Sequence, residues 1–195
     1  VDGTRDEPVR VTSADGSQFW GVFALYGKKA SNSRISNLHM SRGTGQTIEG
    51  VRYIAMFSIH DTENIQIEGL KLSDNKNFDD TMHVIYSKNI QIKNSSVTGA
   101  FSDAIDVDMS TILLDNVVIE DAGNDAIDLM ATSATLTGVK LTKSKDKGVS
   151  VGEGSTAFII NSIISENEIG VETKDGSNTY ISNSDFINNN LQLNA

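Results

Sequence analysis

The sequence predicts an all-β solenoid whose coils each contain about 22 residues. The first indication is a fixed repeat, in which Ile105, Ile127, Val149 and Val171 follow one another at intervals of 22. The second is a corner motif that recurs along most of the chain, and the third is a set of short segments that alternate between apolar and polar residues. A short fixed period filled with β-branched residues is typical of folds in which each coil adds one layer to a continuous core.

The corner motif consists of an apolar residue, any residue, and then Asn or Gly. Asn and Gly tolerate a left-handed backbone better than other residues, so this column predicts a turn. Stacked at the spacing of about 4.8 Å between parallel strands, the Asn side chains are expected to bond to one another as a buried Asn ladder. The motif occurs at Ile35–Asn37, Ile67–Gly69, Ile92–Asn94, Leu114–Asn116, Leu136–Gly138, Ile159–Asn161 and Ile181–Asn183.

The strands are best defined at 104–108, 126–129 and 148–151. Successive side chains of a strand point to opposite faces. Alternation therefore places Ile105 and Val107 inside and Asp106 outside, with the same pattern one coil later at Ile127, Asp128 and Leu129. Gly148 and Gly170 replace the alanines of the preceding coils in one column, which indicates a position of close approach. Helical periodicity is absent, and the chain has a single proline.

Composition limits the possible partners. The chain of 195 residues is expected to form one β-helix domain, 1–195, because a solenoid adds no second hydrophobic centre as it lengthens. Its net charge of −10 argues against nucleic acid and anionic lipid surfaces, and no apolar run is long enough for membrane insertion. With no cysteine, the chain has neither disulfides nor thiolate metal sites.

Three short strands per coil, an Asn corner and rungs of Ile, Val and Leu resemble the pectate lyase-like superfamily over residues 34–195. The resemblance implies a right-handed, single-stranded parallel β-helix. The opening segment, Gly3 to Ala14 followed by Phe19–Gly21, looks like a coil found in many bacterial surface β-helix proteins, which implies a secreted or cell-surface location. It also implies that 104–108 and 126–129 are first strands of their coils, on the face where polysaccharide lyases of this fold carry their sites.

Four aspartates form the candidate metal site. Asp103 and Asp125 are one coil apart, as are Asp106 and Asp128, so stacking predicts a patch of carboxylates two rungs tall. Oxygen-rich clusters without cysteine suit hard cations, and Ca²⁺ takes six to eight oxygen ligands. Asp108 and Asn124 could complete the shell. The alternative is that the outward carboxylates only keep the surface solvated and that the first pair forms turns.

The candidate catalytic residues are Lys147 and His83. Lys147 follows Asp125 by one coil, and His83 occupies the outward position of the coil before Asp106. In calcium-dependent lyases that this chain resembles, Ca²⁺ binds a uronate carboxylate while a Lys or Arg removes a proton before β-elimination. Lys147 is more simply explained as the counter-charge of the aspartates. A carbohydrate epimerase or hydrolase would instead use His83 with Tyr86, or His60.

Two functions remain open from the sequence. The first is an extracellular module that binds or cleaves an acidic polysaccharide with Ca²⁺, and the second is a non-catalytic structural or adhesive stalk. The last coil ends at Leu191–Ala195 with a rung that is incomplete. Because solenoids normally protect their end rungs, we expect other domains or chains to cap the open ends and the chain to be a segment of a longer protein.

Overall fold

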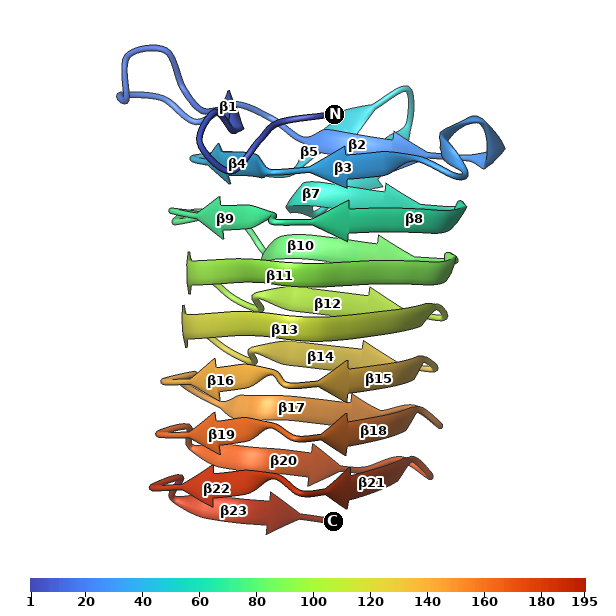
Figure 1. The fold of residues 1–195 in the computed structure, drawn as a ribbon, viewed down its shortest axis with the longest axis vertical. Helices are drawn as coiled ribbons and strands as arrows, with labels where there is room; N and C mark the ends of the chain where they lie inside the picture. The colour runs from blue at the N-terminus through green and yellow to red at the C-terminus, as the bar shows by residue number, and fades with distance from the viewer.

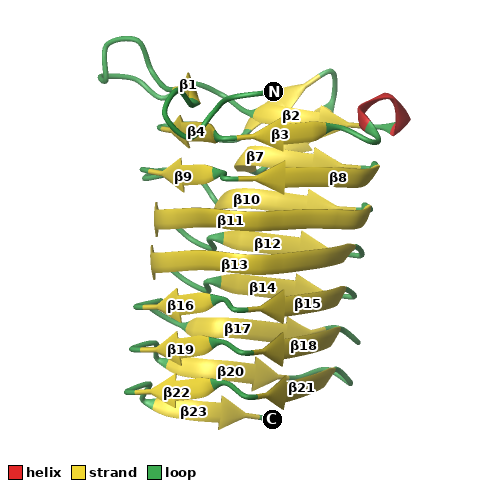
Figure 2. Cartoon of the chain, in the orientation of Figure 1, coloured by secondary structure: helices red, strands yellow, loops and turns green.

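The computed structural model describes residues 1–195 and shows a parallel β-helix. The coils stack along one axis, from the N-terminal end at the top of Figure 1 to the C-terminal end at the bottom. A single helical turn, η1 (Lys28–Ala30), interrupts an otherwise all-β chain (Figure 2). The expected right-handed β-helix with three strands per regular coil is confirmed, as β14, β15 and β16 illustrate.

One wall of the solenoid is an eight-stranded parallel sheet. It receives the first strand of each regular coil, so its strand order follows the chain. Its members are β2 (Phe23–Tyr26), β7 (Ala55–His60), β10 (Asp80–Ile85), β12 (Ile105–Asp108), β14 (Ile127–Met130), β17 (Lys147–Gly152), β20 (Ile169–Thr173) and β23 (Leu191–Asn194).

The other wall is a thirteen-stranded sheet that holds the second and third strands of the coils. Two members, β11 and β13, run through the corner without a break, as Figure 1 shows. The sheet contains β1 (Val9–Val11), β3 (Arg34–Ser36), β4 (Leu38–Ser41), β8 (Glu63–Glu68), β9 (Lys71–Ser73), β11 (Lys88–Ala100), β13 (Thr111–Ala122), β15 (Ser133–Thr137), β16 (Lys140–Thr142), β18 (Thr156–Ile160), β19 (Ile163–Ser165), β21 (Asn178–Ser182) and β22 (Asp185–Ile187).

The core lies between the two walls as a continuous stack. Ile105, Ile127, Val149 and Val171 are in register on successive strands and are all buried. The predicted inward positions are therefore confirmed, and the hydrophobic core comprises 37 buried residues. Gly148 is a close-approach position, because an added Cβ would lie 2.6 Å from the carbonyl oxygen of Gly170.

The predicted corner adopts the left-handed backbone at every coil. The φ angles at this column lie between 47° and 68°, at Asn37, Gly69, Asn94, Asn116, Gly138, Asn161 and Asn183. The Asn side chains of this column were expected to be buried, but the structure shows that they are not. Two exposed pairs bond across rungs, Asn116 to Asn94 and Asn183 to Asn161, each at 2.6 Å, and the glycines interrupt any longer ladder.

The buried polar ladders lie at other corners. One ladder lies at the turn after the first strand, where the backbone N–H of each residue donates a hydrogen bond to the side-chain hydroxyl of the equivalent residue in the next coil. The residues are, in order, Ser87, Ser110, Thr132, Ser155 and Ser177, and the distances are 2.9–3.3 Å. At the turn before the first strand, Asn167 and Asn189 are buried and accept bonds from the preceding coil's backbone. These bonds satisfy backbone donors that the turns leave without strand partners.

The first quarter of the chain departs from the regular coil. An antiparallel hairpin, β5 (Gln46–Ile48) and β6 (Val51–Tyr53), precedes β7. Tyr53 is buried and packs on His60, with ring centroids 4.8 Å apart. The six residues of β7 are all buried, on both faces of the strand. The chain contains no helix with the length and hydropathy needed to cross a bilayer.

Candidate metal centre

The outer face of the eight-stranded sheet carries side chains in rows parallel to the solenoid axis. The central row contains His83, Asp106 and Asp128, which register aligns on β10, β12 and β14. In the next row, Asp108 pairs with Ile85, and Ile85 pairs with His60 on β7. Within one strand, the residues of the two rows are two positions apart, as Asp106 and Asp108 are, so they point to the same face of the sheet. The two rows therefore bring polar side chains from three coils together.

His83, Asp106 and Asp108 form a cluster with metal-ligand geometry. One ligand atom from each lies within 4.8 Å of the other two. His83 Nε2 is 3.2 Å from Asp108 Oδ2 and 3.8 Å from Asp106 Oδ2. The side chains are partly shielded, with exposures of 6% for His83, 16% for Asp106 and 14% for Asp108. This is a site with one nitrogen and two oxygen donors that solvent can still reach.

His60 supports the cluster from the neighbouring strand. Its Nε2 lies 3.2 Å from Nδ1 of His83, and the two rings meet edge to face at 86°. Burial, and then the charge of His83, lowers the pKa of His60 to about 4. His60 is therefore neutral at pH 7 and can accept a hydrogen bond from Nδ1–H of His83, which leaves Nε2 directed toward the two carboxylates.

Asp80 adds a further buried carboxyl beside the cluster. Its pKa is raised by burial and then by the charges of Asp106 and Asp103. The pKa of Asp106 is raised as well, first by burial and then by the charges of Asp108 and Asp128. Mutual repulsion among these groups is a cost that a bound cation would relieve.

Asp103 and Asp125 have structural partners of their own. Asp103 Oδ1 accepts hydrogen bonds from the backbone N–H of Asp125, at 2.7 Å, and from Asn124 Nδ2, at 2.8 Å. Asp125 Oδ1 accepts one from the backbone N–H of Lys147, at 2.8 Å. The two carboxylates thus link successive turns of the solenoid, and neither belongs to a cluster with metal-ligand spacing, nor does Asp128.

Lys147 is surrounded by carboxylates. Its Nζ contacts Asp146 and lies 3.6 Å from Asp125 Oδ1 and 3.8 Å from Glu172 Oε2. Burial alone would lower the pKa of its ammonium group, but the hydrogen bond to Asp146 and the surrounding negative charges outweigh burial and raise it. A raised pKa is the opposite of what a general base requires, so this environment favours the counter-charge role.

The structure thus brings together three of the residues named from sequence, His83, Asp106 and Asp108. It keeps Tyr86 apart, because that side chain is 58% exposed at the end of the strand. Sequence reasoning missed the support from His60 and the proximity of Asp80. The coils before Asp103 are longer, with an interval of 25 from Ser58 to His83 and of 23 from His83 to Asp106, so a strict interval of 22 does not align these positions.

Comparison with known proteins supplies a family. The sequence profile described as "Periplasmic copper-binding protein (NosD)" matches residues 9–195. No curated protein matches the chain significantly in sequence.

Two solved structures resemble the fold at 12% sequence identity. An alginate lyase from Paenibacillus sp. gives a TM-score of 0.43, with 99% of this chain and 86% of the lyase covered. A protein described as a glycosyl hydrolase from Parabacteroides merdae gives 0.37, with 95% of this chain and 83% of that protein covered. At this identity the resemblance is limited to the course of the backbone.

Proposed function

Because the chain belongs to the family described as periplasmic copper-binding protein (NosD), we propose that it binds a divalent transition-metal ion, copper foremost, through His83, Asp106 and Asp108. The family description agrees with the location outside the cytoplasm that the sequence led us to expect. The observation that carries the proposal is the approach of three ligand atoms, from two adjacent coils, to within 4.8 Å of one another.

The donor set suits copper better than calcium. Imidazole is a good ligand for Cu²⁺ and Zn²⁺, and a mixed nitrogen and oxygen set is typical of Cu²⁺ or Ni²⁺. Calcium prefers six to eight oxygens. Among divalent first-row metals, affinity for a given site of this kind peaks at Cu²⁺. The residues present therefore fit the metal that the family description names.

His60 fits the role of a supporting residue. A metal-bound histidine commonly donates its second ring N–H to a neighbouring acceptor, which fixes the tautomer and the ring orientation. Here the acceptor is Nε2 of neutral His60, 3.2 Å from His83 Nδ1. The packing of Tyr53 against the His60 ring holds this acceptor in place. His83 thus presents Nε2 to a metal without a change of rotamer.

Thermal unfolding of metal-stripped protein, with Cu²⁺, Zn²⁺ or Ca²⁺ added, tests the proposal. We expect Cu²⁺ to stabilise the fold by about 2.7 kcal/mol at a hundredfold excess over its Kd. Asp108→Asn and His83→Gln should abolish the stabilisation, and electron paramagnetic resonance of the Cu²⁺ complex should show coupling to nitrogen that His83→Gln removes. His39→Gln controls for adventitious binding, because His39 is the one histidine that neither belongs to the cluster nor supports it.

A second candidate is the calcium-dependent polysaccharide module expected from the sequence. The observation that favours it is a group of carboxyls whose pKa values are raised by burial and by one another's charge, namely Asp80, Asp103, Asp106 and Asp125. Asp128→Asn separates the two proposals, because Asp128 lies outside the three-residue cluster. Stabilisation by Ca²⁺ but not Cu²⁺, lost in Asp128→Asn, would overturn the copper proposal. If neither metal stabilises the fold, the stalk alternative is favoured.

A further inference from the structure

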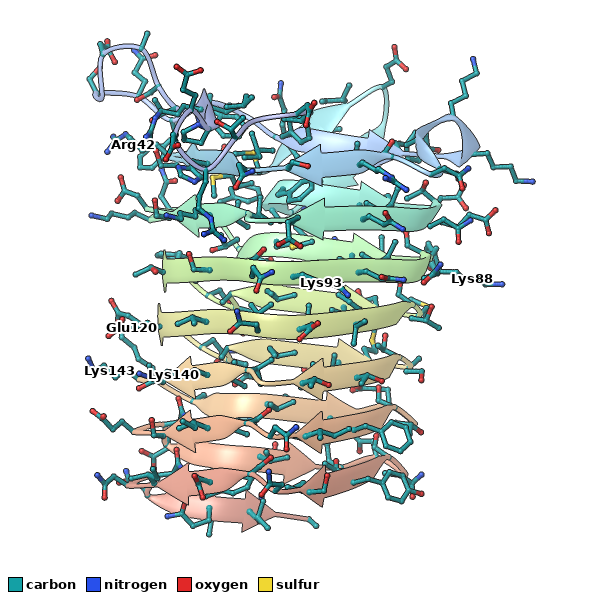
Figure 3. The ribbon with its side chains drawn as sticks, in the orientation of Figure 1. Arg42, Lys88, Lys93, Glu120, Lys140 and Lys143 are labelled. Atoms are coloured by element: carbon teal, nitrogen blue, oxygen red, sulfur yellow. The ribbon has the colours of Figure 1, made fainter.

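A row of basic side chains crosses the opposite wall of the solenoid. β1, β4 and β9 are consecutive parallel strands of the thirteen-stranded sheet. Register aligns Arg10 with His39 and His39 with Lys71. Three nitrogen-bearing side chains therefore repeat at the rung spacing of about 4.8 Å along the solenoid axis. Lys140 occupies the same row further along, after Ser96 and Val118, near the edge of the sheet in Figure 3.

A parallel row of hydroxyl groups lies beside the cations. Ser41 is in register with Ser73, and Thr12 Oγ1 is 2.9 Å from Ser41 Oγ. Together the two rows line a groove of about 200 Å³, which contains no acidic residue. Hydroxyls can both donate and accept hydrogen bonds, so the groove offers positive charge and neutral polar contacts side by side.

The cations of this groove have no internal partner. No carboxylate lies within 4.0 Å of Arg10 or Lys71, and neither side chain makes a hydrogen bond within the protein. Elsewhere some lysines are paired, as Lys143 is with Glu120 at 2.8 Å and Lys93 with Asp115 at 3.7 Å, and others such as Lys88 are not; the groove is distinguished by unpaired cations that are in register on neighbouring strands. In a chain with a net charge of −10, unpaired cations that share a row indicate a ligand from outside.

The positive charges in this row repel one another, and the pKa of His39 shows the effect. Burial, and then the charges of Lys71 and Arg10, lowers its pKa. These two cations, from β9 and β1, are the charged groups that face it. A bound anion would offset the repulsion and favour the protonated imidazole.

We propose that this groove, lined by Arg10, His39 and Lys71, binds the anionic groups of an acidic polysaccharide laid along the solenoid axis. Repeated cations match a polymer with a repeated charge, and the hydroxyl row matches the hydroxyls of sugar rings. Nucleic acids need a broad basic footprint, which the net charge of this chain does not supply. The groove lies on the wall opposite the metal centre, and its function does not depend on a metal.

Binding to dextran sulfate and to polygalacturonate, measured by titration calorimetry in the presence of EDTA, tests the proposal. We expect both polymers to bind and neutral dextran not to. Arg10→Gln/Lys71→Gln should weaken binding about tenfold, since two charge contacts with the polymer are lost. Lys88→Gln/Lys143→Gln removes the same formal charge from opposite edges of the molecule (Figure 3) and should bind like the unmodified protein.

The pH dependence gives a second readout. Sulfate groups stay ionised across the range, so dextran sulfate should bind more tightly as the pH falls and His39 gains a proton, and His39→Gln should remove this change. Equal affinity in the Arg10→Gln/Lys71→Gln variant would overturn the proposal, as would binding that EDTA abolishes. Duplex DNA bound as tightly as dextran sulfate, with the same loss in that variant, would assign the groove to nucleic acid instead.

Discussion

Asp125 illustrates how a single side chain can serve the fold and still make it sensitive to pH. It is 3% exposed, and its carboxylate accepts the backbone N–H of Lys147. Burial raises its pKa to about 7, against an ordinary value of 3.8, although the hydrogen bond and the charge of Lys147 act in the opposite direction. The ionised form is therefore less favourable in the folded chain than in the unfolded one.

This shift predicts that stability falls as the pH rises from about 4 to about 7. In that range the folded state keeps the Asp125 proton while the unfolded chain releases it, so each pH unit costs at most about 1.4 kcal/mol of unfolding free energy. The raised pKa values of Asp80 and Asp106 act in the same direction and extend the range upward.

Urea unfolding at several pH values, in a chelator, measures the effect. Asp125→Asn retains a hydrogen-bond acceptor but cannot ionise, so its stability should change less steeply with pH between 4 and 7. Asp115→Asn, at a solvent-accessible position on β13, is the control and should keep the original slope. An unchanged slope in Asp125→Asn would mean that this carboxyl is not the titrating group.

At the scale of the strands and turns, the sequence predicted the repeating parts well. The inward residues, the corner and the close approach at Gly148 follow from a period of 22 because each is dictated by one residue type at one position. The buried ladders could not be predicted, since Ser, Thr and Asn are equally common in exposed turns. Which turn of a coil is buried depends on how all its strands and turns are arranged, and a residue type at one position does not determine that arrangement.

The metal centre was only partly predictable for a similar reason. Asp106 and His83 were placed on one face by alternation, but the approach of His60 depends on coils longer than 22 residues and on the hairpin whose Tyr53 packs on it. Irregular coils contain no repeat from which such neighbours can be counted.

The buried ladder should contribute more stability than the exposed one. Asn167→Ala removes the acceptor of the Ser144 backbone N–H, at 2.8 Å, and leaves that donor buried. We expect a loss of about 1–3 kcal/mol. Asn116→Gly, at the exposed corner, should change stability by less than about 0.5 kcal/mol, because glycine already fills that column at Gly69 and Gly138. Comparable losses in urea unfolding would contradict this assignment.

At the scale of the molecule, stability is distributed along one axis. An inner strand such as β12 pairs with a strand on each side, whereas β23 pairs with β20 alone. The last strand is also poorly covered, with Leu191 45% and Leu193 54% exposed. In solenoids each repeat contacts only its neighbours, so the ends can open without the centre.

Hydrogen exchange should therefore show a gradient of protection. We expect backbone amides of β10, β12 and β14 to exchange most slowly, and those of β21, β22 and β23 to exchange fastest among the strands of the regular coils. Mass spectrometry of peptic fragments over a time course gives the measurement. Uniform protection from β10 to β23 would show that the chain unfolds as one cooperative unit.

The register of the coils also makes the molecule a graduated ruler. Side chains of one row are separated by a whole number of rungs, so the distance between two groups is set by how many coils lie between them. Duplication of the coil 111–132 would lengthen the ruler and leave His83, Asp106 and Asp108 in place, because all three precede it. A coil inserted between β10 and β12 would move His83 one rung further from Asp106 and Asp108. The length of the solenoid and the residues of its metal cluster can therefore change independently of each other during evolution.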